Sequence, residues 1–237
     1  MRSDRLPSLA TAMTSFCSRP GSDARSPGSL QDRLLALADN ALKTLAGGLH
    51  ASRPTPQAPQ GAAGRALEDA ERELSGRLMR VNHVGEICAQ ALYQGQALVA
   101  RDPALHAHFA QAARDECDHL AWCRERLQQL DSRPSLLDPL WYAGALGLGV
   151  VAGSFGARLS LGFVVETENQ VEQHLASHLQ RLPQADLASR AVVEQMRSDE
   201  VGHATAAEKL GGVQLPAPVR WGMRAAARVM TGTAHWI

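Results

Sequence analysis

Two stretches of this chain carry the same short pattern, Asp-Glu-x-x-His, at residues 115–119 and 199–203. A Glu and a His three residues apart lie on the same side of an α-helix, because three residues turn the helix by about 300°. Glu116 and Glu200 can therefore each join a His in presenting a carboxylate and an imidazole to a metal ion. Two solvated helix faces are the ordinary alternative for so short a pattern. The surroundings of the two stretches decide between these interpretations.

The segments that carry the pattern are helical by their apolar spacing. Aromatic residues make up only 4% of the chain, whereas Ala and Leu are abundant, which favours helices. Pro and Gly signals end the helical segments, and no segment shows the alternation of a half-buried strand. The expected fold class is all-α. Four long helices are expected at about residues 67–101, 104–130, 139–181 and 186–210.

The two patterns fall on the second and fourth of these expected helices. A ferritin-like di-metal bundle of four helices uses two such Glu/His pairs and one further Glu from each of the other two helices. The first helix offers Glu86, the only Glu between residues 74 and 115. The third helix offers Glu166, Glu168 and Glu172. The sequence therefore predicts a ferritin-like four-helix bundle, with three candidates for the fourth carboxylate.

Five longer stretches of the chain carry a more specific signal than the spacing. They are RVNHVGE at 80–86, YQGQ at 93–96, DECDHL at 115–120, ETENQVEQH at 166–174 and SDEVGH at 198–203. In these stretches the chain resembles the demethoxyubiquinol hydroxylases of ubiquinone biosynthesis, in their bacterial form. The likeness spans about residues 70–237, and residues 30–56 also resemble the lead-in of bacterial members. This resemblance implies a di-iron monooxygenase that uses O₂ to hydroxylate a polyprenyl demethoxy-benzoquinol.

The resemblance also implies which residues hold the metal. Matching the stretch VEQH selects Glu168 from the three candidates on the third helix. In sites of this kind Glu116 and Glu200 are expected to bridge two iron ions. The six implied ligands are Glu86, Glu116, His119, Glu168, Glu200 and His203.

Four carboxylates and two imidazoles form an oxygen-rich set that suits iron or manganese better than zinc. Each motif Glu is preceded by an Asp, about 100° round the helix. We expect Asp199 to meet His119, and Asp115 to meet His203, because carboxylates commonly orient metal-bound imidazoles. The chain has no flavin or nicotinamide motif, so the electrons for the reaction are expected from an external donor or from the quinol itself.

Other residues near the predicted site are given lesser roles. His83, one turn before Glu86, is expected to make a supporting polar contact rather than to bind metal. Packing is the favoured role of Tyr93, with a radical role as the alternative. His174 and His178 are expected at the surface or on an access path.

The chain is expected to divide into four parts. Residues 1–29 are interpreted as disordered or as an over-extended start, 30–50 as an amphipathic helix, 51–65 as a linker, and 66–237 as the di-iron domain. The 24 basic residues balance the 24 acidic ones, so nothing indicates nucleic-acid binding.

Residues 139–157 form a run of 19 residues without charge that contains five glycines. A span here would place the two Glu/His patterns on opposite sides of a bilayer, so we expect a monotopic protein on the cytoplasmic face of the bacterial inner membrane. Arg220, Arg224 and Arg228 recur every four residues beside Trp221, which suits an anionic lipid surface. A buried connection between helices is the alternative for the run.

The expected partners are a polyprenyl benzoquinol, membrane lipids and possible other proteins of ubiquinone biosynthesis. Two other functions use the same ligand chemistry. One is a quinol oxidase that reduces O₂ to water, and the other is iron storage by a ferritin-like protein. The uncharged run and the Arg/Trp segment fit storage badly.

Overall fold

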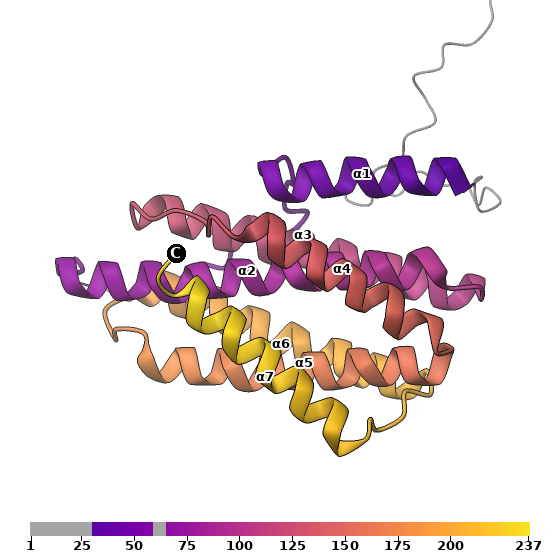
Figure 1. The fold of residues 1–237 in the computed structure, drawn as a ribbon. Helices are drawn as coiled ribbons and strands as arrows, with labels where there is room; N and C mark the ends of the chain where they lie inside the picture. The colour runs from indigo at the N-terminus through magenta and orange to yellow at the C-terminus, as the bar shows by residue number, and fades with distance from the viewer. Residues whose placement is uncertain (1–29, 59–64) are drawn as a thin grey trace, which may run out of the picture.

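Seven α-helices make up the described part of the chain, which covers residues 30–58 and 65–237 of a computed structural model (Figure 1). No β-strand occurs among these residues, so the all-α expectation is confirmed. Residues 1–29, expected to be disordered or over-extended, lie outside the described part. In chain order the helices are α1 Leu30–Ala46, α2 Asp69–Val99, α3 Pro103–Gln129, α4 Asp138–Ser154, α5 Ala157–Arg181, α6 Leu187–Lys209 and α7 Ala217–Ala234.

Helices α2, α3, α5 and α6 form the four-helix bundle as two packed pairs, α2 with α3 and α5 with α6 (Figure 1). Short turns join the members of each pair, and aspartates fix where the second member begins. The side chain of Asp102 accepts a hydrogen bond from the backbone N of Ala104, at 2.9 Å. Asp186 does the same for Ser189, at 3.0 Å. These caps satisfy amide groups that a helix start leaves free.

The single helix expected over residues 139–181 is wrong, because the chain turns between α4 and α5. Gly156 has a φ of 92°, a left-handed conformation that glycine adopts without steric cost. The uncharged sequence around it has no proline, so the apolar pattern alone did not reveal the turn. Helix α4 is a separate crossover that packs on α2 and connects the two pairs of the bundle.

Glycines let α4 approach α2 closely. A Cβ atom on Gly149 would lie 2.2 Å from the carbonyl oxygen of Leu92, and one on Gly95 would lie 2.4 Å from that of Leu146. Real side chains do not tolerate such contacts, so both positions require glycine. Helix packing therefore accounts for part of the glycine content of the uncharged run.

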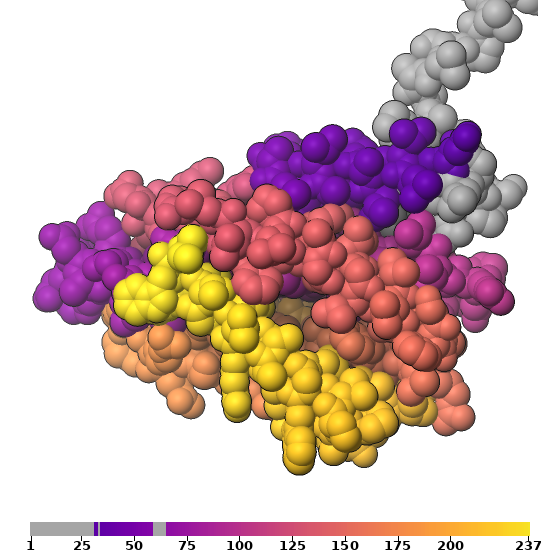
Figure 2. Space-filling view, viewed as in Figure 1, coloured from indigo at the N-terminus to yellow at the C-terminus, as the bar shows by residue number. Residues whose placement is uncertain are grey.

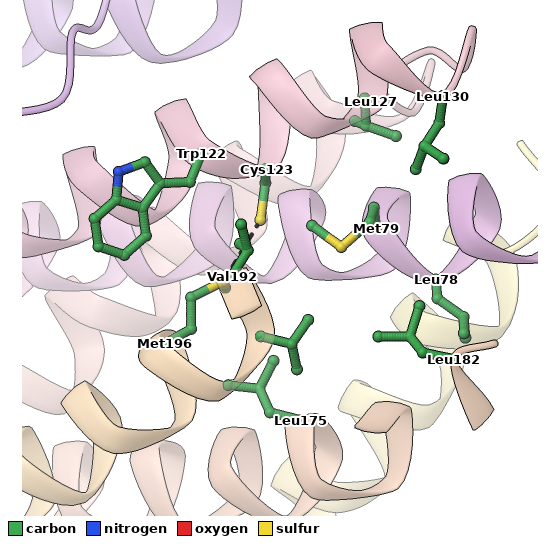
Figure 3. Close-up of a cluster of buried hydrophobic side chains, with 11 residues drawn as sticks. Leu78, Met79, Trp122, Cys123, Leu127, Leu130, Leu175, Leu182, Val192 and Met196 are labelled. Carbon is green, nitrogen blue, oxygen red and sulfur yellow. Dashed lines mark hydrogen bonds between the residues drawn. The ribbon is translucent and has the colours of Figure 1, made fainter. Parts of the chain in front are cut away.

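Two apolar clusters fill the bundle on either side of its middle. Leu175 of α5 lies in the first cluster, among side chains from all four bundle helices (Figure 3). The first cluster contains Leu78, Met79, Trp122, Cys123, Leu127, Leu130, Leu175, Leu182, Val192, Val193 and Met196. The second contains Ala89, Tyr93, Ala97, Phe109, Ala112, Ala113, Leu161, Val164 and Ala207. The buried glutamates of the bundle lie between these two clusters.

Helices α1 and α7 lie outside the bundle. Leu45 of α1, the helix expected to be amphipathic, packs against a cluster that includes Ile87 and Tyr142, but Leu34 and Leu42 are exposed. Residues 51–58, expected to be part of a linker, have no regular secondary structure. No helix in the described ranges is both long and apolar enough to cross a membrane.

Candidate metal centre

Each bundle helix delivers one glutamate to the middle of the bundle. Glu86 comes from α2, Glu116 from α3, Glu168 from α5 and Glu200 from α6, and all four side chains are buried. Burying four carboxylates among apolar clusters is costly unless positive charge accompanies them. The arrangement therefore requires cations, either protonated histidines or metal ions.

These glutamates and two histidines fall into two overlapping groups whose possible ligand atoms lie within 4.8 Å of one another. Glu116 and Glu200 belong to both groups. A residue shared by two neighbouring metal positions is placed to bridge them. The first group is Glu86, Glu116, His119 and Glu200, and the second is Glu116, Glu168, Glu200 and His203.

Both imidazoles turn the same nitrogen toward the carboxylates. Nδ1 of His119 lies 3.2 Å from Oε2 of Glu116 and 3.3 Å from Oε1 of Glu200. Nδ1 of His203 lies 3.2 Å from Oε2 of Glu200 and 3.4 Å from Oε1 of Glu116. The two halves of the site are thus arranged alike, with each Nε2 directed away from the carboxylate cluster.

An aspartate from the opposite pair of helices meets each Nε2. Oδ2 of Asp199 lies 2.9 Å from Nε2 of His119, and Oδ2 of Asp115 lies 3.6 Å from Nε2 of His203. These are the two pairs that the sequence led us to expect. A carboxylate in this position holds an imidazole in one orientation and keeps its other nitrogen free to bind metal.

The carboxylates differ in proton affinity. Burial raises the pKa of Glu86 and of Glu168 well above the usual value. Burial alone would also raise the pKa of Glu116 and of Glu200, but contacts with both histidines outweigh it and lower these two pKa values. The two shared glutamates therefore hold a proton less tightly than Glu86 and Glu168 do.

The histidines supply the compensating charge. Burial alone would lower the pKa of His119, but hydrogen bonds to Asp199 and to the surrounding glutamates raise it well above its usual value. The pKa of His203 is raised for the same reason, with Asp115 as its strongest partner. Protons and metal ions thus compete for this site. Its oxygen-rich donor set fits two divalent ions, whose four positive charges balance four carboxylates.

The three candidates on α5 are separated by their contacts. Glu168 faces the cluster and is buried. Glu166 contacts Arg224 of α7 at 3.4 Å, and Glu172 accepts a hydrogen bond from Arg197 at 2.6 Å. Only Glu168 among the three belongs to a group of possible metal ligands in the described part of the chain.

Tyr93 does more than pack. Its hydroxyl donates a hydrogen bond to Oε1 of Glu168, and its side chain is buried beside the cluster. In the sequence, the spacing of seven residues between Glu86 and Tyr93 already indicated that both lie on the same face of the helix. His83 instead lies against the start of α4, with Nδ1 3.5 Å from Oδ2 of Asp138, and no described contact links it to the six predicted ligands.

His178 is not a surface residue. It is buried, and its ring lies 3.9 Å from that of His174. Burial lowers the pKa of His178 to about 2, so its imidazole is neutral at physiological pH. The spacing of four residues indicates that the two histidines share one face of the helix. It does not indicate whether other helices cover that face, so the burial of His178 was missed.

A cavity of about 130 Å³ borders the site on the side of His203. Both His203 and Tyr93 contribute to its wall. Tyr93, His108, Gln111, Ala112, Asp115, His203 and Ala206 line it.

Comparison with known proteins shows close relatives over most of the chain. Residues 73–234 match the family model "Ubiquinone biosynthesis protein COQ7". A Polaromonas naphthalenivorans protein named 3-demethoxyubiquinol 3-hydroxylase is 61% identical over 206 residues, covering 87% of this chain and 98% of the relative. Proteins of the same name from Verminephrobacter eiseniae and Ralstonia pickettii are 60% identical over 206 residues and 56% identical over 215 residues. Each covers 87% of this chain, and 98% and 99% of the relative respectively.

The matched region includes α3, α5 and α6, all of α2 except its first four residues, and every residue of the carboxylate and histidine cluster. The resemblance seen in the sequence is therefore confirmed at the level of the family. The chain belongs to the COQ7 family of ubiquinone biosynthesis proteins.

Proposed function

We propose that this protein is a di-iron monooxygenase that hydroxylates 3-demethoxyubiquinol, a polyprenyl benzoquinol, with O₂. The observation that carries the proposal is the buried cluster of four glutamates and two histidines, which occurs in a chain 61% identical to a protein named as this hydroxylase. The names of the relatives favour hydroxylation over quinol oxidation and iron storage, the two other functions considered.

In this proposal Glu86 and His119 hold the first metal position, and Glu168 and His203 hold the second. Glu116 and Glu200, which belong to both ligand groups, hold the two positions together. When bound, iron supplies the redox chemistry that reduces O₂ and delivers one oxygen atom to the aromatic ring. The second oxygen atom leaves as water, which requires two electrons from an external donor and two protons.

The remaining residues shape the site around this chemistry. The two apolar clusters exclude water from both ends of the group of glutamates and histidines. This exclusion strengthens electrostatic interactions within that group. Tyr93 orients Glu168 through its hydroxyl. The cavity beside His203 provides the side from which O₂ and the edge of the quinol ring approach.

The substrate has a long isoprenoid tail and is dissolved in the membrane, so the protein must meet a lipid surface. Helices α4 and α7 both lie on the face of the molecule shown in Figure 2, and both expose large apolar side chains. We infer that these helices attach the protein peripherally to the cytoplasmic face of the bacterial inner membrane. The exposed residues are Leu140, Leu148 and Val151 on α4, Phe155 just after it, and Val219, Trp221 and Val229 on α7.

The expected basic stripe of α7 is partly engaged with the protein itself. Arg224 contacts Glu166 at 3.4 Å, and Arg220 is half-buried beside the same helix, α5. These two arginines therefore offer less charge to a lipid surface than the sequence pattern indicated. Apolar contact is the larger part of the proposed membrane attachment.

Lipid extraction from a strain that lacks this gene tests the function. We expect demethoxyubiquinone to accumulate and ubiquinone to return when the wild-type gene is supplied. Purified protein supplied with quinol, ¹⁸O₂ and a reductant should yield a hydroxylated product that contains one labelled oxygen. Normal ubiquinone in the deletion strain would overturn the proposal, and oxidised but unhydroxylated quinone would favour a quinol oxidase.

A further inference from the structure

Residues 51–55, here called the lead-in strap, lie along α3 next to the proposed metal centre. The backbone N of Ser52 donates to Oδ1 of Asp118 at 2.6 Å, and its hydroxyl lies 3.0 Å from the same oxygen. Asp118 is buried and immediately precedes His119. A buried carboxylate that accepts several hydrogen bonds fixes its partners firmly, so this segment is anchored rather than a free linker.

Arg53 of the strap joins the two pairs of bundle helices. Its Nε donates to Oδ2 of Asp118 on α3 at 2.6 Å, and its Nη2 lies 2.9 Å from Oδ2 of Asp199 on α6. Trp122 supports this position, because its indole N donates to the carbonyl oxygen of Arg53 at 3.3 Å and its ring lies 4.8 Å from the guanidinium carbon. The planar fork of arginine suits two carboxylates at once.

One oxygen atom connects the strap to the metal centre. Oδ2 of Asp199, which contacts Arg53, is also the atom that lies 2.9 Å from Nε2 of His119. The other oxygen of Asp199 accepts a hydrogen bond from Gln195 at 2.9 Å. Both oxygens of Asp199 are therefore held, and the orientation of His119 depends on that position.

The other half of the site has no such support. Asp115 lies farther from its histidine, with Oδ2 3.6 Å from Nε2 of His203, and Gln111 is its neutral hydrogen-bond partner. No Lys or Arg forms an ion pair with Asp115 within the part of the chain that the structure describes. The side chain of His203 is 16% exposed and borders the cavity, whereas that of His119 is completely buried.

We propose that the lead-in strap closes the first of the two metal positions, and that Arg53 positions His119 through Asp199. This proposal rests on the metal centre proposed above. The metal ion held by Glu86 and His119 is then the slowly released one. The ion held by Glu168 and His203, next to the cavity, exchanges faster because water and competing ligands reach it and its histidine is less firmly oriented.

The rate of iron release should distinguish the two metal positions. Protein loaded anaerobically with two Fe(II) ions and mixed with excess ferrozine should release one ion quickly and one slowly. Arg53→Gln should accelerate the slow phase about tenfold or more and leave the fast phase unchanged. Arg53→Lys, which keeps the charge but not the fork, should give an intermediate rate. Asp115→Asn should accelerate only the fast phase.

A matched control is Arg197→Gln, which removes an arginine–carboxylate contact between α6 and α5 that involves none of the six proposed ligands, and should change neither phase. Hydrogen exchange gives a second measurement that does not depend on activity. Iron should slow amide exchange of the peptide containing Ser52, since coupling between two sites is reciprocal. This protection should disappear in Arg53→Gln.

Release of both ions in one phase would overturn the strap proposal, as would an Arg53→Gln variant with both phases unchanged. Acceleration of both phases by Arg53→Gln would also overturn it, because the strap would then stabilise the bundle as a whole. A wild-type protein that binds no iron would overturn the metal centre itself, which is a different result from two bound ions that are insensitive to Arg53.

Discussion

Asp199 and His119 lie 2.9 Å apart across the bundle, although 80 residues separate them in the sequence. The contact joins α6 to α3, and it fixes the side of the imidazole that faces away from the carboxylates. Burial alone would raise the pKa of Asp199, but its contacts with His119 and Arg53 lower it, so it remains an anion. A fixed anion in this position holds a proton on Nε2 and presents Nδ1 to a metal ion.

Replacing Asp199 with Asn should weaken iron binding. The amide keeps the shape of the side chain but loses its charge, so it no longer selects one orientation of His119 by a charge-assisted hydrogen bond. We expect affinity to fall by roughly 10- to 100-fold, the usual effect of losing such a partner. Competition with a chelator of known affinity measures this change. Unaltered affinity would show that His119 is oriented by packing alone.

Glu200→Ala should abolish binding of both iron ions. Glu200 belongs to both groups of possible ligands, so its removal takes one oxygen donor from each metal position. Iron content determined by mass spectrometry should fall from about two ions per chain to nearly none, while circular dichroism should still report a helical protein. Two tightly bound ions in this variant would contradict the assignment of Glu200 as a bridge.

Three single substitutions on α5 test the fourth carboxylate. Glu168→Gln should lose iron, because Glu168 is buried within the cluster. Glu166→Gln and Glu172→Gln should retain it, because these residues contact Arg224 and Arg197 instead. The two outer variants serve as controls for the inner one. Loss of iron in Glu172→Gln alone would require the helix to be shifted by one turn.

Regular helical periodicity is what made much of this site predictable. A Glu and a His three apart share a face, and an Asp one residue earlier is rotated by about 100°, so a bundle of such helices brings Asp199 to His119 and Asp115 to His203. These relations depend only on local geometry and on the way four helices pack.

Other features could not be predicted from periodicity, because they depend on contacts between residues that are far apart in the sequence. Arg53 contacts Asp118, which lies 65 residues further along the chain. Arg53 belongs to a Pro/Gly-rich segment without periodicity, so nothing in its sequence indicates this contact. The turn at Gly156 lies in an uncharged run where neither a proline nor a charged residue marks a helix end. The burial of His178, which was expected at the surface or on an access path, was also missed, because burial depends on the packing of neighbouring helices.

Membrane attachment should depend on exposed apolar residues of α7. Trp221 is 68% exposed and Val229 is 60% exposed. Replacing both with Ser should reduce binding to liposomes by roughly tenfold or more, since each side chain contributes on the order of 1 kcal/mol when it leaves water. Sedimentation with vesicles at low and high salt measures the effect, which should persist at high salt. Leu42→Ser, an exposed apolar site on α1, is the control. Equal loss in the control would mean that binding is unspecific.

His178 should make the protein less stable in acid. Neither of its ring nitrogens has a hydrogen-bond partner among the described residues, and burial, together with the neighbouring basic groups, lowers its pKa to about 2. In the unfolded chain a histidine has a pKa of about 6.5. The unfolded state therefore takes up a proton between these values while the folded state does not. The free energy of unfolding consequently falls as the pH drops below about 6.5.

The variant His178→Phe removes this proton uptake. At pH 5, about 1.5 units below the unfolded pKa, the histidine should cost the folded state roughly 2 kcal/mol. Between pH 7.5 and pH 5 the variant should therefore lose about 2 kcal/mol less stability than the wild-type protein. Urea unfolding of metal-free protein at both pH values measures this difference, and metal-free samples prevent acid release of iron from contributing. If both proteins lose the same stability between the two pH values, His178 is already protonated or solvated in the folded state.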